Sequence, residues 1–113
     1  MSDADEDAQL SPAAFHILIA LADGDQHGYA VMKDVAERTS GRIRLGPGTL
    51  YGTIKRLLEQ GFVEEVRRRA SSEPHDERRR TYHLTRSGRR AAQAEVARMA
   101  ETLKQARSLG LAP

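Results

Sequence analysis

The stretch LGPGTLYGTIKRLLEQGFV, residues 45–63, contains the signals of a turn, an amphipathic helix and the start of a strand. Gly46-Pro47-Gly48 predicts a turn that leads into a helix over about residues 47–60, since proline at the first helical position loses no hydrogen bond. Gly61 stands where a helix commonly ends in a left-handed residue. The inner face is expected to hold apolar side chains spaced i, i+4, i+7 and i+8, which are Leu50, Ile54, Leu57 and Leu58.

Two further helices are expected before this stretch. Ser11-Pro12 begins the first, which runs to about Ala22, because serine caps free amides and proline suits the first turn. The second opens at His27-Gly28-Tyr29 and ends near Thr39. The first helix is apolar nearly all round and must be covered on both sides, so we predict that one side meets a second subunit. Complete burial within one chain is the alternative. The residues named for the subunit contact are Phe15, Ile19 and Ala22.

A β-hairpin and one long helix are expected after the stretch. The strands cover about residues 62–68 and 80–84, and a polar loop at 70–77 joins them. Thr85 caps a final helix over about residues 86–108, along which apolar residues alternate spacings of four and three. Such a narrow seam is typical of helices that pair with another helix, so we predict a dimer interface. After Ala92, the residues named for it are Val96, Met99, Leu103 and Ala106.

The order of these elements predicts a mainly helical fold with a small β-hairpin. Three helices followed by a hairpin make a winged helix-turn-helix, in which the third helix can enter the major groove of DNA. The chain is therefore divided into a disordered acidic tail at 1–9, a winged helix-turn-helix DNA-binding domain at 10–84 and a C-terminal dimerisation helix at 85–113.

The outer side of the third helix favours nucleic acid as a partner. Its residues are small or polar, and no acid occurs between Arg42 and Arg56. Small side chains let the helix axis approach base edges, while cations meet phosphates. An ordinary solvated face is the alternative, although such a face usually mixes its charges. We expect base contacts from Thr49, Gly52 and Lys55, and a phosphate contact from Arg56.

Charge is distributed unevenly along the chain. The formal net charge is only +2, but Asp3, Asp5, Glu6 and Asp7 make the first nine residues acidic and leave the remainder basic. Arginine runs at 67–69 and 78–80 end the first strand and begin the second. Because such clustering is repulsive without an anion, we predict that the hairpin binds DNA backbone; a solubilising edge is the alternative. The residues named for this contact are Arg68, Arg69, Arg78 and Arg79.

The tyrosines allow two interpretations. Tyr29 lies at a helix N-terminus and Tyr51 flanks the outer side of the third helix, so each hydroxyl can reach a phosphate or pack at a core edge. Both residues are named as DNA contacts, with packing as the alternative. Tyr82 stands between Thr81 and His83 in a strand and is expected in the core.

Several motifs resemble those of PadR-like transcriptional regulators. They are LGPGTLY at 45–51 followed by Ile54, Gly61-Phe62-Val63, His27-Gly28-Tyr29 and RTYHLTRSGR at 80–89, so that the resemblance covers about residues 10–90. It implies a winged-helix homodimer that represses transcription at a two-fold operator, with the C-terminal helix packed on the partner's N-terminal helix. The length implies the short type with a single C-terminal helix.

The resemblance also bears on small-molecule effectors. Some short members of the family bind planar drugs between subunits with a tryptophan. This chain has no Trp, and residues 85–113 contain no aromatic residue. Phe15 is the aromatic residue left to line a cavity between subunits.

Other functional classes lack support in the sequence. The chain has no Cys, no catalytic constellation and no helical zinc spacing, and Gly46-Pro47-Gly48 is not followed as a phosphate loop would be. We therefore expect no enzyme activity, metal or cofactor. No apolar run approaches the length of a membrane span, and the polar start is unlike a secretory signal, so a cytoplasmic location is expected.

These observations predict a sequence-specific DNA-binding repressor that acts as a homodimer on a double-stranded operator. A small-molecule effector would act at the dimer interface. The alternative is a winged-helix protein–protein adaptor that uses the hairpin and binds no specific DNA.

Overall fold

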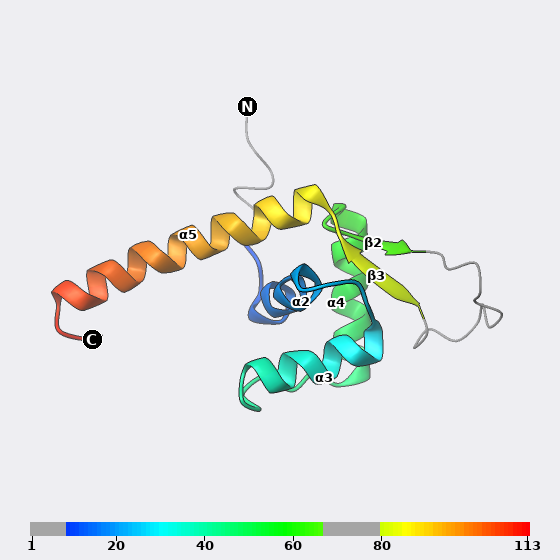
Figure 1. Ribbon diagram of the computed structural model, residues 1–113, viewed down its shortest axis with the longest axis horizontal. Helices are drawn as coiled ribbons and strands as arrows, with labels where there is room; N and C mark the ends of the chain where they lie inside the picture. The colour runs from blue at the N-terminus through cyan, green and yellow to red at the C-terminus, as the bar shows by residue number, and fades with distance from the viewer. Residues whose placement is uncertain (1–8, 67–79) are drawn as a thin grey trace.

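A computed structural model describes residues 9–66 and 80–113 of the chain. Figure 1 shows three helices packed beside a small sheet, with a long last helix projecting from this body. The predicted helices and both hairpin strands are confirmed. The acidic tail up to residue 8 and the arginines at 67–69, 78 and 79 lie outside the described residues. The elements are α2 (Pro12–Ala22), β1 (Gln26–His27), α3 (Gly28–Arg38), α4 (Pro47–Gln60), β2 (Val63–Val66), β3 (Thr81–Leu84) and α5 (Arg86–Ser108).

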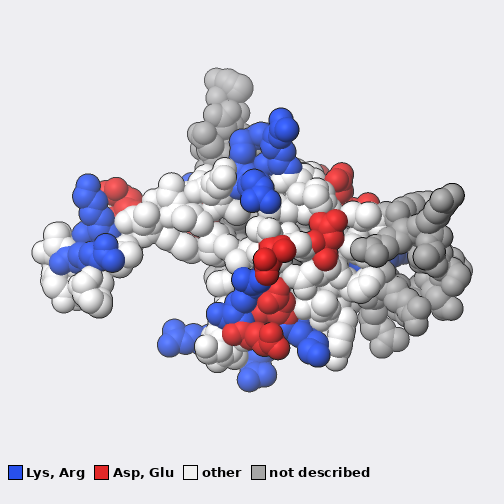
Figure 2. Space-filling model, in the orientation of Figure 1, with Lys and Arg blue, Asp and Glu red and all other residues white. Residues whose placement is uncertain are grey.

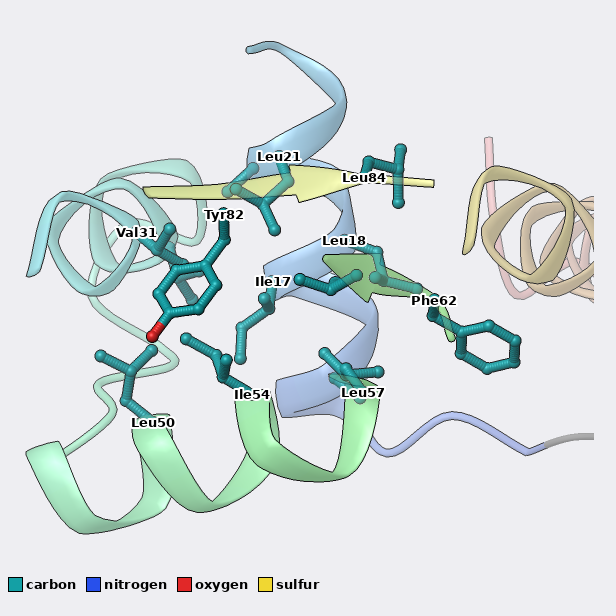
Figure 3. Packing of buried hydrophobic residues seen from close by; sticks show 14 of the residues in the cluster. Ile17, Leu18, Leu21, Val31, Leu50, Ile54, Leu57, Phe62, Tyr82 and Leu84 are labelled. Atoms are coloured by element: carbon teal, nitrogen blue, oxygen red, sulfur yellow. The ribbon is translucent and has the colours of Figure 1, made fainter. Parts of the chain in front are cut away.

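Helix α2 lies at the centre of the core, which Figure 3 shows from close by. It begins as expected, since Ser11 Oγ accepts a hydrogen bond from the Ala14 amide at 3.1 Å. Ile17 and Leu18 are fully buried, because α2 packs against α3, α4, α5 and β3. Helix α4 packs on this core through its predicted face, of which Leu50, Ile54 and Leu57 are buried and Leu58 is partly buried.

The sheet contains one strand that the sequence analysis did not predict. Its order is β1-β3-β2 with antiparallel pairs, and Gln26 of β1 lies opposite Tyr82 of β3. His27, expected in a turn, belongs to this strand, and its Nδ1 lies 3.2 Å from Thr81 Oγ1. Strand β1 therefore fixes the start of α3 to the second strand of the wing. Tyr82 is buried, as predicted.

The first turns of α5, residues 85–91, form what we call the foot of α5. The Thr85 amide donates to the Phe62 carbonyl at 3.1 Å, and Thr85 Oγ1 donates to the Gly61 carbonyl at 2.7 Å. Thr85 Oγ1 also caps the helix by accepting from the Gly88 amide. A Cβ at Gly88 would overlap the Phe62 carbonyl oxygen, so this contact requires glycine. The foot is thereby joined to the end of α4, where Gly61 has the expected left-handed φ of 78°.

Beyond the foot, α5 leaves the body of the protein, and its apolar seam is open (Figure 1). Val96, Met99 and Leu103 are 47%, 46% and 42% exposed. On α2, Ile19 is partly exposed and Ala22 is exposed. Phe15 differs from the expectation: it is only 7% exposed, because α2 packs against its neighbours on most sides. Phe15 therefore offers little surface to a second subunit.

Candidate nucleic-acid interface

The outer face of α4 consists of the residues that point away from the core. The helix begins at Pro47, and its cap residue Gly46 provides no side-chain hydrogen bond to the first-turn amides. There is no acidic residue in that first turn. A helix N-terminus with free amides and no nearby carboxylate favours an anion. The members of the outer face are Gly48, Thr49, Gly52, Lys55, Arg56 and Glu59.

Two glycines on the outer face have no explanation inside the chain. A Cβ built on Gly48 or Gly52 would meet no atom within 4 Å, and neither residue has a positive φ. Glycine inside a helix costs roughly 0.5–1 kcal/mol relative to alanine. The two positions are spaced i, i+4 and so share one side of α4. A flat strip of helix is thus kept free of side chains where the protein itself leaves room for them.

Cations flank this strip. Lys55 and Arg56 are both exposed, one and a half turns after Thr49. Arg56 Nη2 also donates a hydrogen bond to Thr53 Oγ1, at 3.4 Å, from a position on the edge of the face. Thr53 itself is buried, so its hydroxyl holds the arginine close to the helix. The predicted residues Thr49, Gly52, Lys55 and Arg56 are therefore together on one exposed surface.

Tyr29 is the second predicted contact that is open to a partner. It is 52% exposed in the first turn of α3, and its ring lies 6.0 Å from Lys33 Nζ. Sequence reasoning did not single out Lys33, although its i, i+4 spacing from Tyr29 is the signal of such a pair. The ring and the ammonium group together offer a hydroxyl donor and a cation beside the free end of α3.

Tyr51 does not occupy the position expected of a phosphate contact. Its hydroxyl oxygen is buried, and its ring lies against Gly28 at the start of α3. A Cβ at Gly28 would come within 2.7 Å of the Tyr51 ring, so this packing requires glycine there. Tyr51 therefore sets the distance between α3 and α4, and the packing interpretation replaces the phosphate contact.

At the base of the hairpin, only one of the predicted arginine runs is partly in view. Arg80 Nε lies 3.7 Å from Glu65 Oε2 across the two strands. Arg68, Arg69, Arg78 and Arg79 lie outside the described residues. The wing contribution to the interface therefore remains a prediction from sequence.

The acidic residues of the helical body gather on a different side. Figure 2 shows them in the middle of a face from which α4 is hidden behind α2 and α3. Arg38 donates hydrogen bonds to Asp34 at 3.0 Å and to Asp23 at 2.8 Å, and these bonds raise the pKa of Arg38. His83 Nδ1 lies 2.7 Å from Asp25 Oδ1. The carboxylates are thus engaged away from the outer face of α4.

The described residues give no sign of other site types. Within 9–66 and 80–113, no group of three or more His, Asp or Glu side chains could hold a metal ion. In the same part of the chain, no helix has the length and apolar character needed to cross a membrane. The outer face of α4 is therefore the surface to compare with known proteins.

Residues 17–94 match the model of the transcriptional regulator PadR-like family. The chain belongs to the PadR-like family. A curated relative, an uncharacterised 37.1 kDa protein in transposon TN4556 of Streptomyces fradiae, is 39% identical over 84 residues. That match covers 74% of the PadR-like chain but 22% of the relative, so the chain spans about a fifth of the relative's length.

Solved structures share the fold of this PadR-like chain. A PadR family transcription regulator from Clostridium difficile has a TM-score of 0.72 at 23% identity, covering 88% of this chain and 98% of the other. A transcriptional regulator from Clostridium thermocellum has a TM-score of 0.70 at 24% identity, covering 85% and 87%. Family membership makes the protein a transcriptional regulator with a winged helix for DNA binding, from a family of regulators and not of enzymes.

Proposed function

We propose that this PadR-like regulator binds a specific double-stranded operator as a homodimer and represses transcription there. The observation that carries the proposal is the pair Gly48 and Gly52, which keep one side of α4 bare at a cost in helix stability. A bare and basic helix side suits the major groove, where the helix backbone must approach base edges closely.

The residues of the interface divide into two roles. Thr49 and Lys55 extend from the bare strip and read base edges, and Gly52 admits the helix to the groove. Arg56 and Tyr29 hold phosphates on either side, with Lys33 supporting Tyr29. Tyr51 supports the geometry from behind α4. The wing arginines named for the flanking backbone are Arg68, Arg69, Arg78 and Arg79.

Two copies are joined through the distal half of α5, which we define as residues 95–108. Its exposed seam forms one wall of an open groove that also includes Gln9 and Thr102. A second copy would bury this seam and the open side of α2. Residues 10–84 then act as the DNA-binding head and 85–113 as the dimerisation helix. The residues proposed for the interface are Ile19, Ala22, Val96, Met99, Leu103 and Ala106.

A dimer of this kind sets the form of the operator and of regulation. Two heads related by a two-fold axis require half-sites about one helical turn apart, ~34–36 Å. A small-molecule effector would act by favouring one spacing of the heads over another. Since Phe15 is covered by its own chain, such a ligand would rest on the aliphatic seam of α5. Acting on chromosomal DNA, the protein would work in the cytoplasm.

Selection of bound duplexes from a random DNA pool tests the proposal. A two-fold sequence should be enriched, and binding to it should weaken steeply with salt, since each neutralised phosphate adds about 0.9 to the slope of log K against log salt. Equal affinity for all sequences, or no binding at physiological salt, would overturn the proposal. The second result would favour the protein–protein adaptor.

A further inference from the structure

The start of α5 has a basic surface that the proposed DNA contact does not use. Arg86, Arg89 and Arg90 are exposed there, and we call them the arginine patch. Figure 2 shows basic side chains gathered over the start of α5. The foot of α5 adjoins the carboxyl end of α4, whereas Gly48 and Thr49 stand at its amino end. The patch is therefore remote from the bare strip of α4.

The arginine patch is unfavourable within the described structure. It lies at the amino end of a 23-residue helix, where the helix dipole favours acids, and the first turn contains none. Arg86 and Arg89 form no ion pair with a described residue. The next acid along the helix, Glu95, is paired with Arg98 at 2.7 Å. The patch therefore requires negative charge from another part of the chain or from a partner.

The chain itself contains a segment with that charge. Asp3, Asp5, Glu6 and Asp7 make residues 3–7 an acidic segment without a single base. The segment joins the described chain at Gln9, which lines the open groove with Glu95 and Met99 of α5.

The length of the segment suits the distance. Residues 3–7 reach roughly 7–20 Å from Gln9 at ~3.3 Å per residue. Along α5, Arg90 lies about 8–14 Å from the turn that contains Glu95 and Met99, at ~1.5 Å per residue. The segment can therefore reach the patch while Gln9 stays in place.

We propose that the acidic segment, residues 3–7, docks on the arginine patch of α5. There its carboxylates supply the acids that the helix N-terminus lacks, and they screen the three guanidinium groups from DNA. Attraction of DNA is then concentrated on the outer face of α4 and the wing. The docking itself does not depend on the proposed function, whereas the screening role does. Since exposed ion pairs are weak and screened by salt, docking is reversible and strongest at low ionic strength.

A spin label on Ser2→Cys in the full chain tests the docking, because the natural sequence has no other thiol. At about 0.01 M salt, where the Debye length is about 30 Å, the amide signals of residues 86–93 should weaken about twofold or more against a diamagnetic label. At about 1 M salt the signals should recover. Replacing Arg86, Arg89 and Arg90 with Gln should remove the effect, whereas the matched surface change Lys104→Gln should leave it.

Two results would overturn the docking. One is the absence of weakening over residues 86–93 at low salt. The other is weakening over residues 48–56, which would place the acidic segment on the outer face of α4. Persistence of the effect when all four acids are changed to Asn or Gln would also contradict an electrostatic contact. Circular dichroism on each variant checks that α5 remains folded.

A second measurement separates docking from its consequence for DNA. Neutralising the four acids should strengthen binding to a duplex of unrelated sequence and steepen its salt dependence by roughly one to three in the log–log slope, as freed arginines meet phosphates. An unchanged slope would refute the screening role. If no duplex is bound by any variant, the proposed function fails, while the spin-label result still decides whether the segment docks.

Discussion

The foot of α5 and the outer face of α4 both have glycine inside a helix, for different reasons. At the foot, Gly88 lies against the Phe62 backbone, and a side chain would overlap it. On α4, Gly48 and Gly52 have open space where a side chain would stand. The first glycine is required by the fold, and the other two weaken it. A helix that gives up stability without a packing reason is shaped for something outside the chain.

The same comparison extends along α5. Its foot is held by hydrogen bonds from Thr85 to the Gly61 and Phe62 carbonyls, whereas its distal half exposes Val96, Met99 and Leu103. Apolar surface of that kind suits a second copy, and the bare basic strip of α4 suits DNA. The two open surfaces thus differ in chemistry because they face different partners.

The largest expected effect comes from breaking the distal half of α5. Met99→Asp with Leu103→Asp should give monomers in sedimentation and lower operator affinity by roughly 10²–10⁴, because the second head no longer binds as part of one molecule. Ala100→Asp places the same charge on the exposed opposite side of the helix and should leave the dimer intact. An unaltered dimer in the double variant would remove α5 from the interface.

Gly88→Ala should break the foot of α5. The added methyl group overlaps the Phe62 carbonyl oxygen, so the free energy of unfolding should fall by about 1–3 kcal/mol or more in denaturant titrations. Base preference at the operator should stay the same, since Gly88 is far from the outer face. A variant as stable as the natural chain would show that α5 does not approach β2 this closely.

Lys55→Ala should sharpen the contrast between reading bases and holding phosphates. Loss of a base contact costs about 1–3 kcal/mol and relaxes preference at one position of each half-site, which competition with single-base operator variants measures. Arg56→Ala is the matched control, because losing a phosphate contact weakens all sequences alike and lowers the salt slope by about one. If the two variants behave alike, the assignment of Lys55 to a base is wrong.

The sequence was sufficient for elements whose signal is local. The caps at Ser11 and Thr85 and the spacing of Leu50, Ile54 and Leu57 located three helices correctly. Strand β1 was missed because two residues have no periodicity and its pairing partner lies far along the chain. Such a strand exists only through the tertiary contact with β3.

The candidate interface was predictable as a set but not in the direction of each side chain. The i, i+4 spacing placed Gly48 and Gly52 on the outer side of α4, yet no pattern distinguishes them from a packing glycine such as Gly28. Tyr51 turned inward because Gly28 leaves room for its ring, and Phe15 was covered by neighbours of α2. Both outcomes depend on how helices meet, which residue spacing within one helix does not encode.

Gly52→Ala tests the central claim most directly, because it should move stability and DNA binding in opposite directions. The free energy of unfolding should rise by roughly 0.5–1 kcal/mol, since alanine favours the helix and the added methyl group meets nothing within the chain. Affinity for the selected operator should fall by about tenfold or more, which corresponds to about 1.4 kcal/mol, because the methyl group stands where the helix approaches the bases. A stabilised protein with unchanged operator affinity would contradict the assignment of this face to DNA.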